Sequence, residues 1–280
     1  MAHVRILLTI AALLLLNGAA LAQEALGSVA SVRPQATGSL GGARVTLIRG
    51  AELREGETVI TGDAGEVQVI FSDQTKLVIG RGSSLLIERY LLRSDGRPEK
   101  FAVNALAGTF RFITGKGDKN AYKIATPTGT LGVRGTEFDF TVDRATGQTS
   151  VILFQGAVIL CPLSGECITL NQRCSVAQMV SERDAHVLDE ESDRLGVANT
   201  TFPYVISQSR LRREFQVGRP YQCASPSARA GGPVMRSEAP SDDSSSPPPP
   251  PPPDDGGPCG TGDDSGDSGD EPEQGLFVVC

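Results

Sequence analysis

Cysteine is the residue type in this chain whose number and spacing point most directly to chemistry. The 280 residues include six: Cys161, Cys167, Cys174, Cys223, Cys259 and Cys280. An even number of cysteines indicates disulfide bonds if the chain is exported to an oxidising compartment. Cys161 and Cys167 flank a Pro-Leu-Ser-Gly-Glu loop, which would place them opposite each other on a hairpin, within reach of a bridge. We expect that bond, and we assign Cys174–Cys223 and Cys259–Cys280 among the remaining pairings.

Metal binding is the alternative use of these side chains. A zinc site normally contains closely paired cysteines, whereas five and six residues separate the first three cysteines here. The acidic run at residues 263–270 offers oxygen ligands for calcium, but its spacing lacks the EF-hand register. We therefore expect no metal and no cofactor.

Catalytic groups are scarce. The chain has two histidines, His3 and His186, and no Gly-x-Ser-x-Gly, His-Glu-x-x-His or phosphate-loop motif. Glu137 and Asp139 share one face of an expected strand. Neighbouring acids on an outer face are usually solvated, without the separated pKa values that acid–base catalysis requires. We expect a protein without enzymatic activity.

Arg134 stands in the run Gly132-Val133-Arg134-Gly135. Glycine permits positive φ and close backbone approach, so the arginine would project from a tight bend. Its guanidinium could pair with Glu137 or Asp139 and fix the turn, which we expect because such ion pairs are usually architectural. The alternative is that Arg134 holds an acidic partner or ligand.

Short strands separated by Gly, Asp and Ser turns must position these residues. From residue 27 to 176 the chain is a series of short segments rich in Val, Ile, Thr and Phe. In the clearest segment, Phe138, Phe140 and Val142 alternate with polar residues, the period of a strand with one buried face. Residues 151–154 are apolar on both faces and should form a central strand.

The spacing of these segments predicts an all-β fold, either a short-stranded, twisted β-solenoid-like domain or a sandwich. After residue 180 the pattern changes. Residues 181–195 are charged and weakly helical, and residues 207–215 could form a short helix capped by Ser207, with Gly218 as its stop. We expect residues 23–180 to form the β domain and residues 181–224 to form a mixed, helical extension packed on it.

The first 22 residues are typical of a secretory signal peptide. Arg5 precedes an apolar run over residues 6–16, and Ala20-Leu21-Ala22 provides a cleavage site. The run is short for a membrane span. We expect cleavage after Ala22, no membrane span in the mature chain, and a periplasmic or secreted protein.

Residues 225–280 differ in composition from the rest of the chain. They contain a proline run over residues 247–253, which favours an extended spacer. From Ser237 onward there are eleven acidic residues and no basic one. Such a segment buries too little apolar surface to fold alone, so we expect a disordered tail.

Charge excludes a generic nucleic-acid binder. The chain has 26 basic and 33 acidic residues, for a net charge of −7, and the excess of acid belongs to the tail. A nucleic-acid-binding domain would normally carry a strong basic footprint. We therefore expect no nucleic acid among the partners.

Three stretches carry a family resemblance. The first runs from Leu53 to Asp73 and the second from Gly108 to Phe112. The third is the most specific and includes Thr126, Pro127, Gly132, Arg134, Gly135, Thr136, Glu137 and Phe138. Together they resemble the FecR domain, the periplasmic domain of ferric-citrate-type regulators, over roughly residues 27–160.

The resemblance implies an exported all-β domain without catalytic residues. In the family's regulators this domain relays the occupancy of an outer-membrane transporter to a cytoplasmic sigma factor. This chain shows no anti-sigma segment before the domain and no β-α-β module after residue 180, so we expect no direct control of a sigma factor.

Two functions of different classes remain. The first is a non-enzymatic FecR-like accessory module for binding or signalling, whose partner is a protein of the cell envelope. The second is a structural envelope protein that binds cell-wall glycan or another surface polymer. Glycan sites favour aromatic platforms, and a chain with no Trp and four Tyr offers few.

Overall fold

The computed structural model describes residues 25–92, 94, 98–117 and 121–226. The expected signal peptide, the expected tail beyond Pro226 and the Cys259–Cys280 pairing lie outside the described residues. Within the described ranges, no helix is long and apolar enough to cross a membrane.

Most of the described chain is β-structure, as predicted, and its strands belong to one sheet of 15 strands. Along the main path the strand order is β15-β14-β12-β11-β10-β9-β7-β6-β1-β4. The pairing of β9 with β10 is parallel. The strands are β1 Gly27–Arg33, β2 Ala36–Leu40, β3 Ala43–Thr46, β4 Glu52–Leu53, β5 Thr58–Thr61, β6 Glu66–Phe71, β7 Lys76–Ile79, β8 Ser84–Leu92, β9 Pro98–Ile113, β10 Tyr122–Thr126, β11 Gly129–Val142, β12 Thr149–Pro162, β13 Ile168–Leu170, β14 Val176–Met179 and β15 Ala185–Val187.

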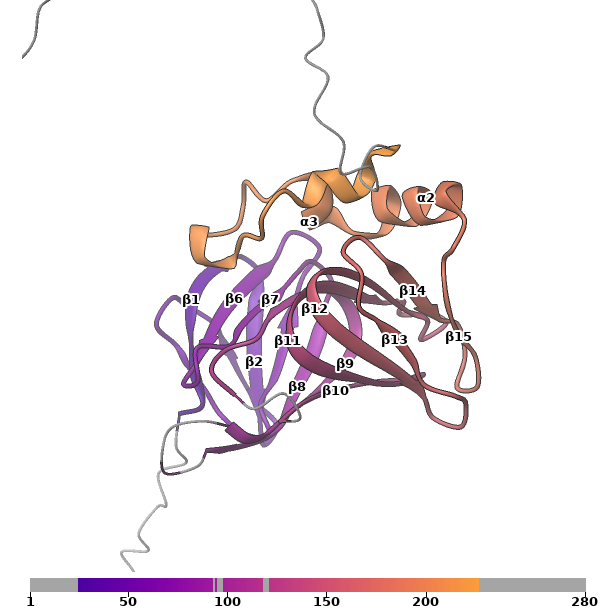
Figure 1. Cartoon of the computed structure of the whole chain (residues 1–280). Helices are drawn as coiled ribbons and strands as arrows, with labels where there is room; N and C mark the ends of the chain where they lie inside the picture. Colours follow the sequence, from indigo (N-terminus) through magenta and orange to yellow (C-terminus); the bar gives the residue numbers. More distant parts are fainter. Residues whose placement is uncertain (1–24, 93, 95–97, 118–120, 227–280) are drawn as a thin grey trace, which may run out of the picture. The chain divides into compact units, whose positions relative to one another are not determined.

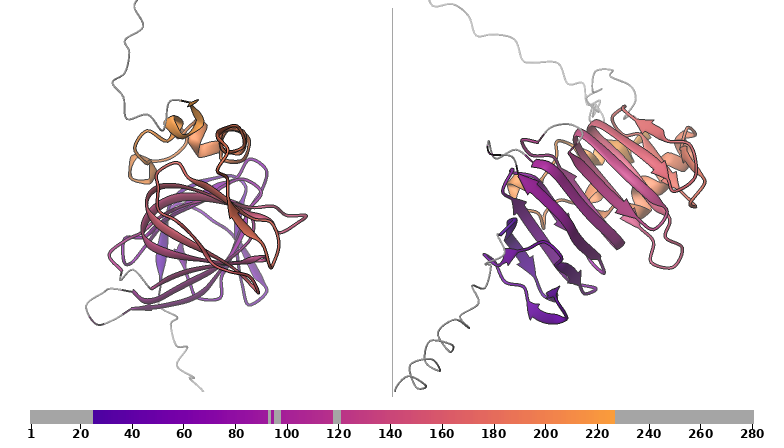
Figure 2. Two further views of the ribbon diagram at one scale, coloured as in Figure 1. Left: turned by 45° about the vertical axis from the view of Figure 1, so that its right-hand side comes forward. Right: turned by 90° about the horizontal axis from the view of Figure 1, so that it is seen from below.

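The main hydrophobic core lies on the inner face of this sheet, which curls so that its strands surround a common interior (Figure 2). Five aromatic rings meet there with centroids 4.9 to 5.9 Å apart, and they belong to Phe71, Tyr90, Phe101, Phe112 and Tyr122. Each buried aromatic side chain removes a large apolar area from water, so this cluster is a principal source of the stability of the sheet.

Strands β11 and β12 confirm two predictions from the sequence. Phe138, Phe140 and Val142 of β11 face the main core and are at most 3% exposed. Residues 151–154 of β12 are buried between β11 and β14, because one face contacts the main core and the other faces a second apolar cluster. In a strand that is buried on both faces, polar and apolar residues do not have to alternate.

The segment after β15 lies across the outer face of the sheet, where it appears in orange (Figure 1). It contains α2 (Glu191–Thr201), α3 (Pro203–Ile206) and two short 3-10 turns, η1 (Arg213–Phe215) and η2 (Pro220–Ala224). Phe202 and Val205 pack with Phe154 in the second apolar cluster. Tyr204 and Phe215 pack with Val78 in a third. We call residues 188–225 the extension.

The helix expected to begin at Ser207 is not found. Helix α3 ends at Ile206, and Ser207 is its C-cap, with its N–H donating to the carbonyl of Pro203. Only residues 213–215 of the expected segment form a helical turn. Burial of Tyr204 and Val205 against the sheet decides where the helix lies, since tertiary packing overrides weak local propensity.

Two disulfide bonds confirm two of the predicted pairings. Cys161–Cys167 joins β12 to the start of β13 across a hairpin. Cys174–Cys223 links the turn before β14 to η2, over a sequence separation of 49 residues. The second bond therefore fastens the far end of the extension to the sheet.

A buried ion pair within the sheet forms hydrogen bonds with the middle of the extension. Arg111 of β9 and Asp139 of β11 lie opposite each other in register, and both side chains are 0% exposed. The Nε–Oδ1 distance is 2.6 Å and the Nη2–Oδ2 distance is 2.8 Å. The remaining guanidinium donors reach Gln208 Oε1 and the carbonyl oxygens of Tyr204 and Phe215.

Asp139 therefore corrects a prediction. Its carboxylate is not solvated, because the extension covers it, and it forms its ion pair with Arg111 instead of Arg134. Burial raises the pKa of the Asp139 carboxyl, and the Arg111 guanidinium opposes that shift. The rings of Phe154 and Tyr204 lie 5.2 and 5.4 Å from the Arg111 guanidinium carbon and add cation–π contacts.

We predict that Arg111→Met destabilises the protein strongly. The substitution keeps an apolar stem but leaves Asp139 buried without a cation and removes one of the two donors to Gln208 Oε1, the other being the N–H of Val217. Removing one partner of a buried ion pair typically costs about 3–5 kcal/mol. Urea denaturation followed by circular dichroism at neutral pH measures the change in the free energy of unfolding.

Arg134→Ala is the matched control, because Arg134 is an exposed arginine of the same sheet. Its effect should stay within about 0.5 kcal/mol, as for most surface substitutions. A loss below about 1 kcal/mol for Arg111→Met would show that the buried pair does not hold the structure together.

Candidate functional site

The outward face of β11 has a covered half and an open half. Alternate residues of a strand share a face, and Leu131 and Val133 point into the main core. Thr130, Gly132 and Arg134 therefore point outward. They lie along the first half of β11, away from Asp139, over which the extension packs. The open half is where sheet surface remains available to another molecule.

A bulge separates the two halves. The pairing of β11 with β12 shifts register between Arg134 and Glu137. Gly135 and Gly156 face each other at this point with φ values of +64° and +84°, in the left-handed region that favours glycine. A β-bulge bends its strand and changes the direction of its side chains. Gly135, directly after Arg134, is therefore part of the bulge that orients the arginine side chain.

Arg134 borders a hollow of about 260 Å³ on the open half. Strands β10, β11 and β12 contribute its walls, and the lining residues include Lys123, Thr130, Gly132, Arg134, Ile159 and Cys161. Lys123 and Arg134 are both exposed. Two cations beside the half-buried Ile159 provide a charge that would attract a carboxylate and an apolar surface against which its stem could pack.

The expected pairing of Arg134 within its own turn is not found. Glu137 is half-buried and forms no ion pair with Arg134, and Asp139 is held by Arg111. Within the described part of the chain, no hydrogen bond or ion pair of the Arg134 side chain is present. This leaves its guanidinium donors directed at solvent or at a partner.

The other motif residues shape the strands around Arg134. Thr126 ends β10 and Pro127 opens the turn into β11, where a missing N–H does no harm to the ladder. The N–H of Thr136 donates to Thr114 Oγ1 at 2.7 Å, which fixes the bulge to the end of β9. Phe138 is buried in the main core.

A buried carboxylate that the sequence analysis missed lies inside the core. Asp73 is 1% exposed and accepts hydrogen bonds from Tyr90 Oη at 3.0 Å, Tyr122 Oη at 2.7 Å and Thr75 Oγ1 at 2.6 Å. Tyr90 and Tyr122 lie 17 and 49 residues away in sequence, so no local pattern reveals the network. Buried polar groups that are satisfied in this way stabilise one arrangement of the core.

The described residues contain no group of three or more His, Cys, Asp or Glu side chains that could hold a metal ion. His186 is exposed on β15, with Nδ1 at 3.8 Å from an exposed Asp184 oxygen. Glu137 and Asp139, the two acids that share a strand face, lie in different surroundings, since only Asp139 is enclosed. These side chains do not converge on a common site.

Residues 57–159 match the family model described as FecR protein. Two crystal structures of a candidate anti-sigma factor from Parabacteroides distasonis ATCC 8503 are similar at 17% and 16% identity, each with a TM-score of 0.37. The match covers 47% of this chain and 57% of that protein, so the chain spans little more than half of its length.

A structure described as a cell surface anchoring domain is also similar, at 35% identity and a TM-score of 0.21. That match covers 22% of this chain and 82% of the other. No curated protein matches the chain.

We predict unequal costs for alanine at the two bulge glycines. A Cβ at Gly156 would lie 2.2 Å from the Gly135 carbonyl oxygen, whereas a Cβ at Gly135 meets nothing within 4 Å. Gly135→Ala should lose about 1 kcal/mol through its positive φ alone. Gly156→Ala should lose more than about 2 kcal/mol, because backbone must also move. Thermal and urea unfolding of the two variants compare them, and equal losses would contradict this account of the bulge.

We also predict that tyrosine ionisation is coupled to alkaline unfolding. Burial and the Asp73 charge raise the pKa of Tyr90, and burial raises the pKa of Tyr122 to about 12. The fold favours the neutral phenols, so their contribution is complete below the pKa of a free tyrosine, about 10, and is lost as the pH rises through the folded-state values. Absorbance at the tyrosinate band and circular dichroism should therefore change together near or above pH 12. Ionisation of Tyr90 and Tyr122 near pH 10 in a folded protein would contradict this prediction.

Proposed function

Because residues 57–159 match the FecR family model, we propose that this protein is a non-enzymatic binding and signalling accessory module of the cell envelope. The observation that carries the proposal is the exposed Arg134 on the open half of β11. It belongs to the most specific motif of the family resemblance, and its side chain has no partner within the described residues. A motif arginine that stabilises nothing in its own fold is available for a partner.

The proposed partner is an envelope protein that presents an acidic side chain. Arginine donates two parallel hydrogen bonds to a carboxylate, so it fixes the orientation as well as the charge of the group it binds. Lys123 adds a second positive charge beside the same hollow, which would steer the encounter. The half-buried Ile159 supplies the apolar contact that helps exclude water from the bound pair.

The two disulfide bonds support an extracytoplasmic location for this module. Disulfides persist in oxidising compartments such as the periplasm and are rare in the cytosol. The proposed signal peptide over residues 1–22, cleaved after Ala22, would deliver the chain there. In this proposal the mature protein acts in the periplasm or outside the cell, without catalysis.

Photo-crosslinking in living cells tests the proposal. A crosslinking amino acid replaces Thr130, which lines the same hollow as Arg134, and the captured proteins are identified in otherwise unaltered and Arg134→Glu backgrounds. We expect one envelope protein to dominate the capture. Charge reversal at Arg134 should lower its yield at least about tenfold, since a like charge now faces the acidic group.

Arg44→Glu is the matched control, because Arg44 is an exposed arginine on strand β3 that does not line this hollow. It should leave the capture unchanged, and circular dichroism should show the same fold for all variants. Equal capture of the same proteins by the Arg134→Glu variant would refute a contact at Arg134. Recovery of cell-wall material alone, equally by all variants, would favour the structural polymer-binding function instead.

A further inference from the structure

A second candidate site lies between the extension and the outer face of the sheet. Two neighbouring cavities, of about 540 and 510 Å³, share three lining residues, Thr109, Thr200 and Thr201. Each volume is in the range of small-molecule sites. Because they share these lining residues, we treat the two cavities as one groove beside the end of α2 and call it the α2 groove.

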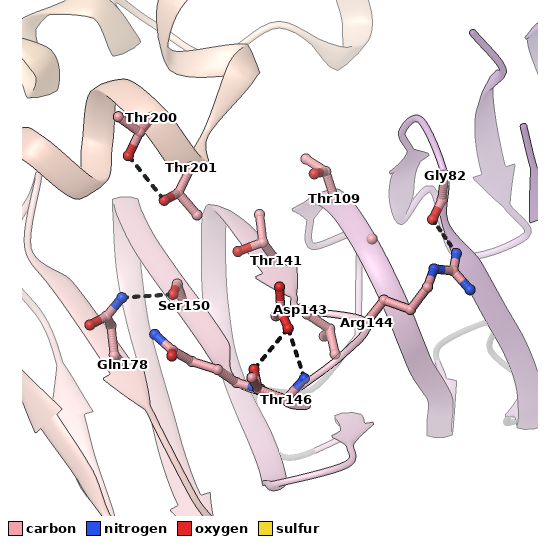
Figure 3. A pocket seen from close by; sticks show the side chains of 13 residues that line it. Gly82, Thr109, Thr141, Asp143, Arg144, Thr146, Ser150, Gln178, Thr200 and Thr201 are labelled. Carbon is pink, nitrogen blue, oxygen red and sulfur yellow. Dashed lines mark hydrogen bonds between the residues drawn. The ribbon is translucent and has the colours of Figure 1, made fainter. Parts of the chain in front are cut away.

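Hydroxyl and amide groups dominate the first cavity of this groove. Figure 3 shows side chains from β9, β11, β12, β14 and α2 around the same space. Thr141 and Gln148 line it, and within the described residues no hydrogen bond of either side chain is present. Gln178 donates to Ser150 Oγ at 3.1 Å and keeps its amide oxygen as an acceptor. The cavity therefore offers several polar groups that can still bind a ligand.

The two carboxylates of the groove are engaged within the protein. Asp143 Oδ1 accepts from the backbone N–H groups of Ala145 and Thr146 and from the Thr146 hydroxyl. These bonds lower the pKa of Asp143 and keep it ionised in its turn. Glu66 is buried in the second cavity and accepts from Tyr204 Oη at 3.1 Å and from Gln68 Nε2 at 2.9 Å.

Three arginines line the same groove with donors to spare. Arg144 donates from Nη2 to the Gly82 carbonyl at 2.7 Å, which leaves its other guanidinium donors available. Arg81 and Arg210 are exposed in the second cavity, and neither side chain has an ion pair in the described ranges. Three arginines line the α2 groove against two carboxylates, so the charged side chains of its lining are net positive and favour an anionic ligand.

The lining also indicates what kind of anion would fit. A peptide groove usually offers apolar pockets for side-chain anchors. Here the large apolar surfaces are limited to Val142, Pro203 and the ring of Tyr204, and that ring already contacts Arg111. Clustered hydroxyl, amide and guanidinium groups instead match a ligand with many hydroxyls and spaced negative charges.

We propose that the α2 groove binds an anionic saccharide chain. The threonine, serine and glutamine groups of the first cavity hydrogen-bond its hydroxyls, and Arg81, Arg144 and Arg210 bind its charged groups. Carboxylate and phosphate groups share the chemistry that arginine recognises, so either kind of acidic sugar fits. This site is separate from the Arg134 hollow, with which it shares no lining residue.

Titration of the isotopically labelled mature chain by heteronuclear NMR tests the proposal. The probes are tetragalacturonate, mannose 6-phosphate, neutral maltotetraose and the acidic peptide tetraglutamate. We expect at least one acidic sugar to shift the amide signals of Thr109, Thr141, Thr146 and Thr201. Its dissociation constant should be at least about tenfold lower than that of maltotetraose. Comparing the first two probes identifies the charged group, and added salt should weaken the binding.

The double variant Arg81→Gln/Arg210→Gln should weaken this binding at least about tenfold, while Arg44→Gln leaves it unchanged. Arg134→Ala should also leave it unchanged, so failure here and failure of the proposed protein contact are distinguishable. Equal or tighter binding of tetraglutamate would show an acidic-peptide groove instead. Equal binding of maltotetraose, or no shift with either acidic sugar, would overturn the proposal.

Discussion

The buried ion pair between Arg111 and Asp139 couples the sheet to the extension that covers it. Two charges removed from water are stable only when their geometry and remaining hydrogen bonds are good. Here the bidentate contact supplies the geometry, and the extension supplies Gln208 and two carbonyl acceptors. The extension therefore keeps water from this pair, and its hydrogen bonds with Arg111 in turn fix the position of the extension on the sheet.

The extension covers only part of the outer sheet face and so divides this face into a buried surface, a groove and an exposed surface. Where the extension packs, side chains such as Phe154 are buried, and the margin beside α2 forms a polar groove. Beyond the bulge at Gly135, the same strand presents Arg134 to solvent. A single β-strand thus contributes to the stability of the fold, to a proposed saccharide groove and to a proposed protein contact. The two disulfides preserve this arrangement in an oxidising compartment.

The sequence predicts best what is local. The alternation around Phe138 and Phe140 identifies a strand with one buried face, and the loop between Cys161 and Cys167 identifies a hairpin disulfide. It fails where distant segments decide the outcome. Asp139 is buried because Arg111 lies 28 residues away and residues beyond 200 cover it, which no periodicity encodes. The FecR resemblance located the open Arg134, but the α2 groove exists only once the extension has folded against the sheet.

Native-state hydrogen exchange of the whole protein, with Arg111→Lys beside the unaltered form, tests most directly whether the ion pair holds the extension. Lysine keeps the charge but loses the bidentate geometry and the donors to Gln208 and the carbonyls. We expect amides of the extension, such as those of Val205 and Val217, to lose protection at least about tenfold more than core amides of β6 and β12. Unchanged protection of the extension, or equal loss throughout the sheet, would contradict the account.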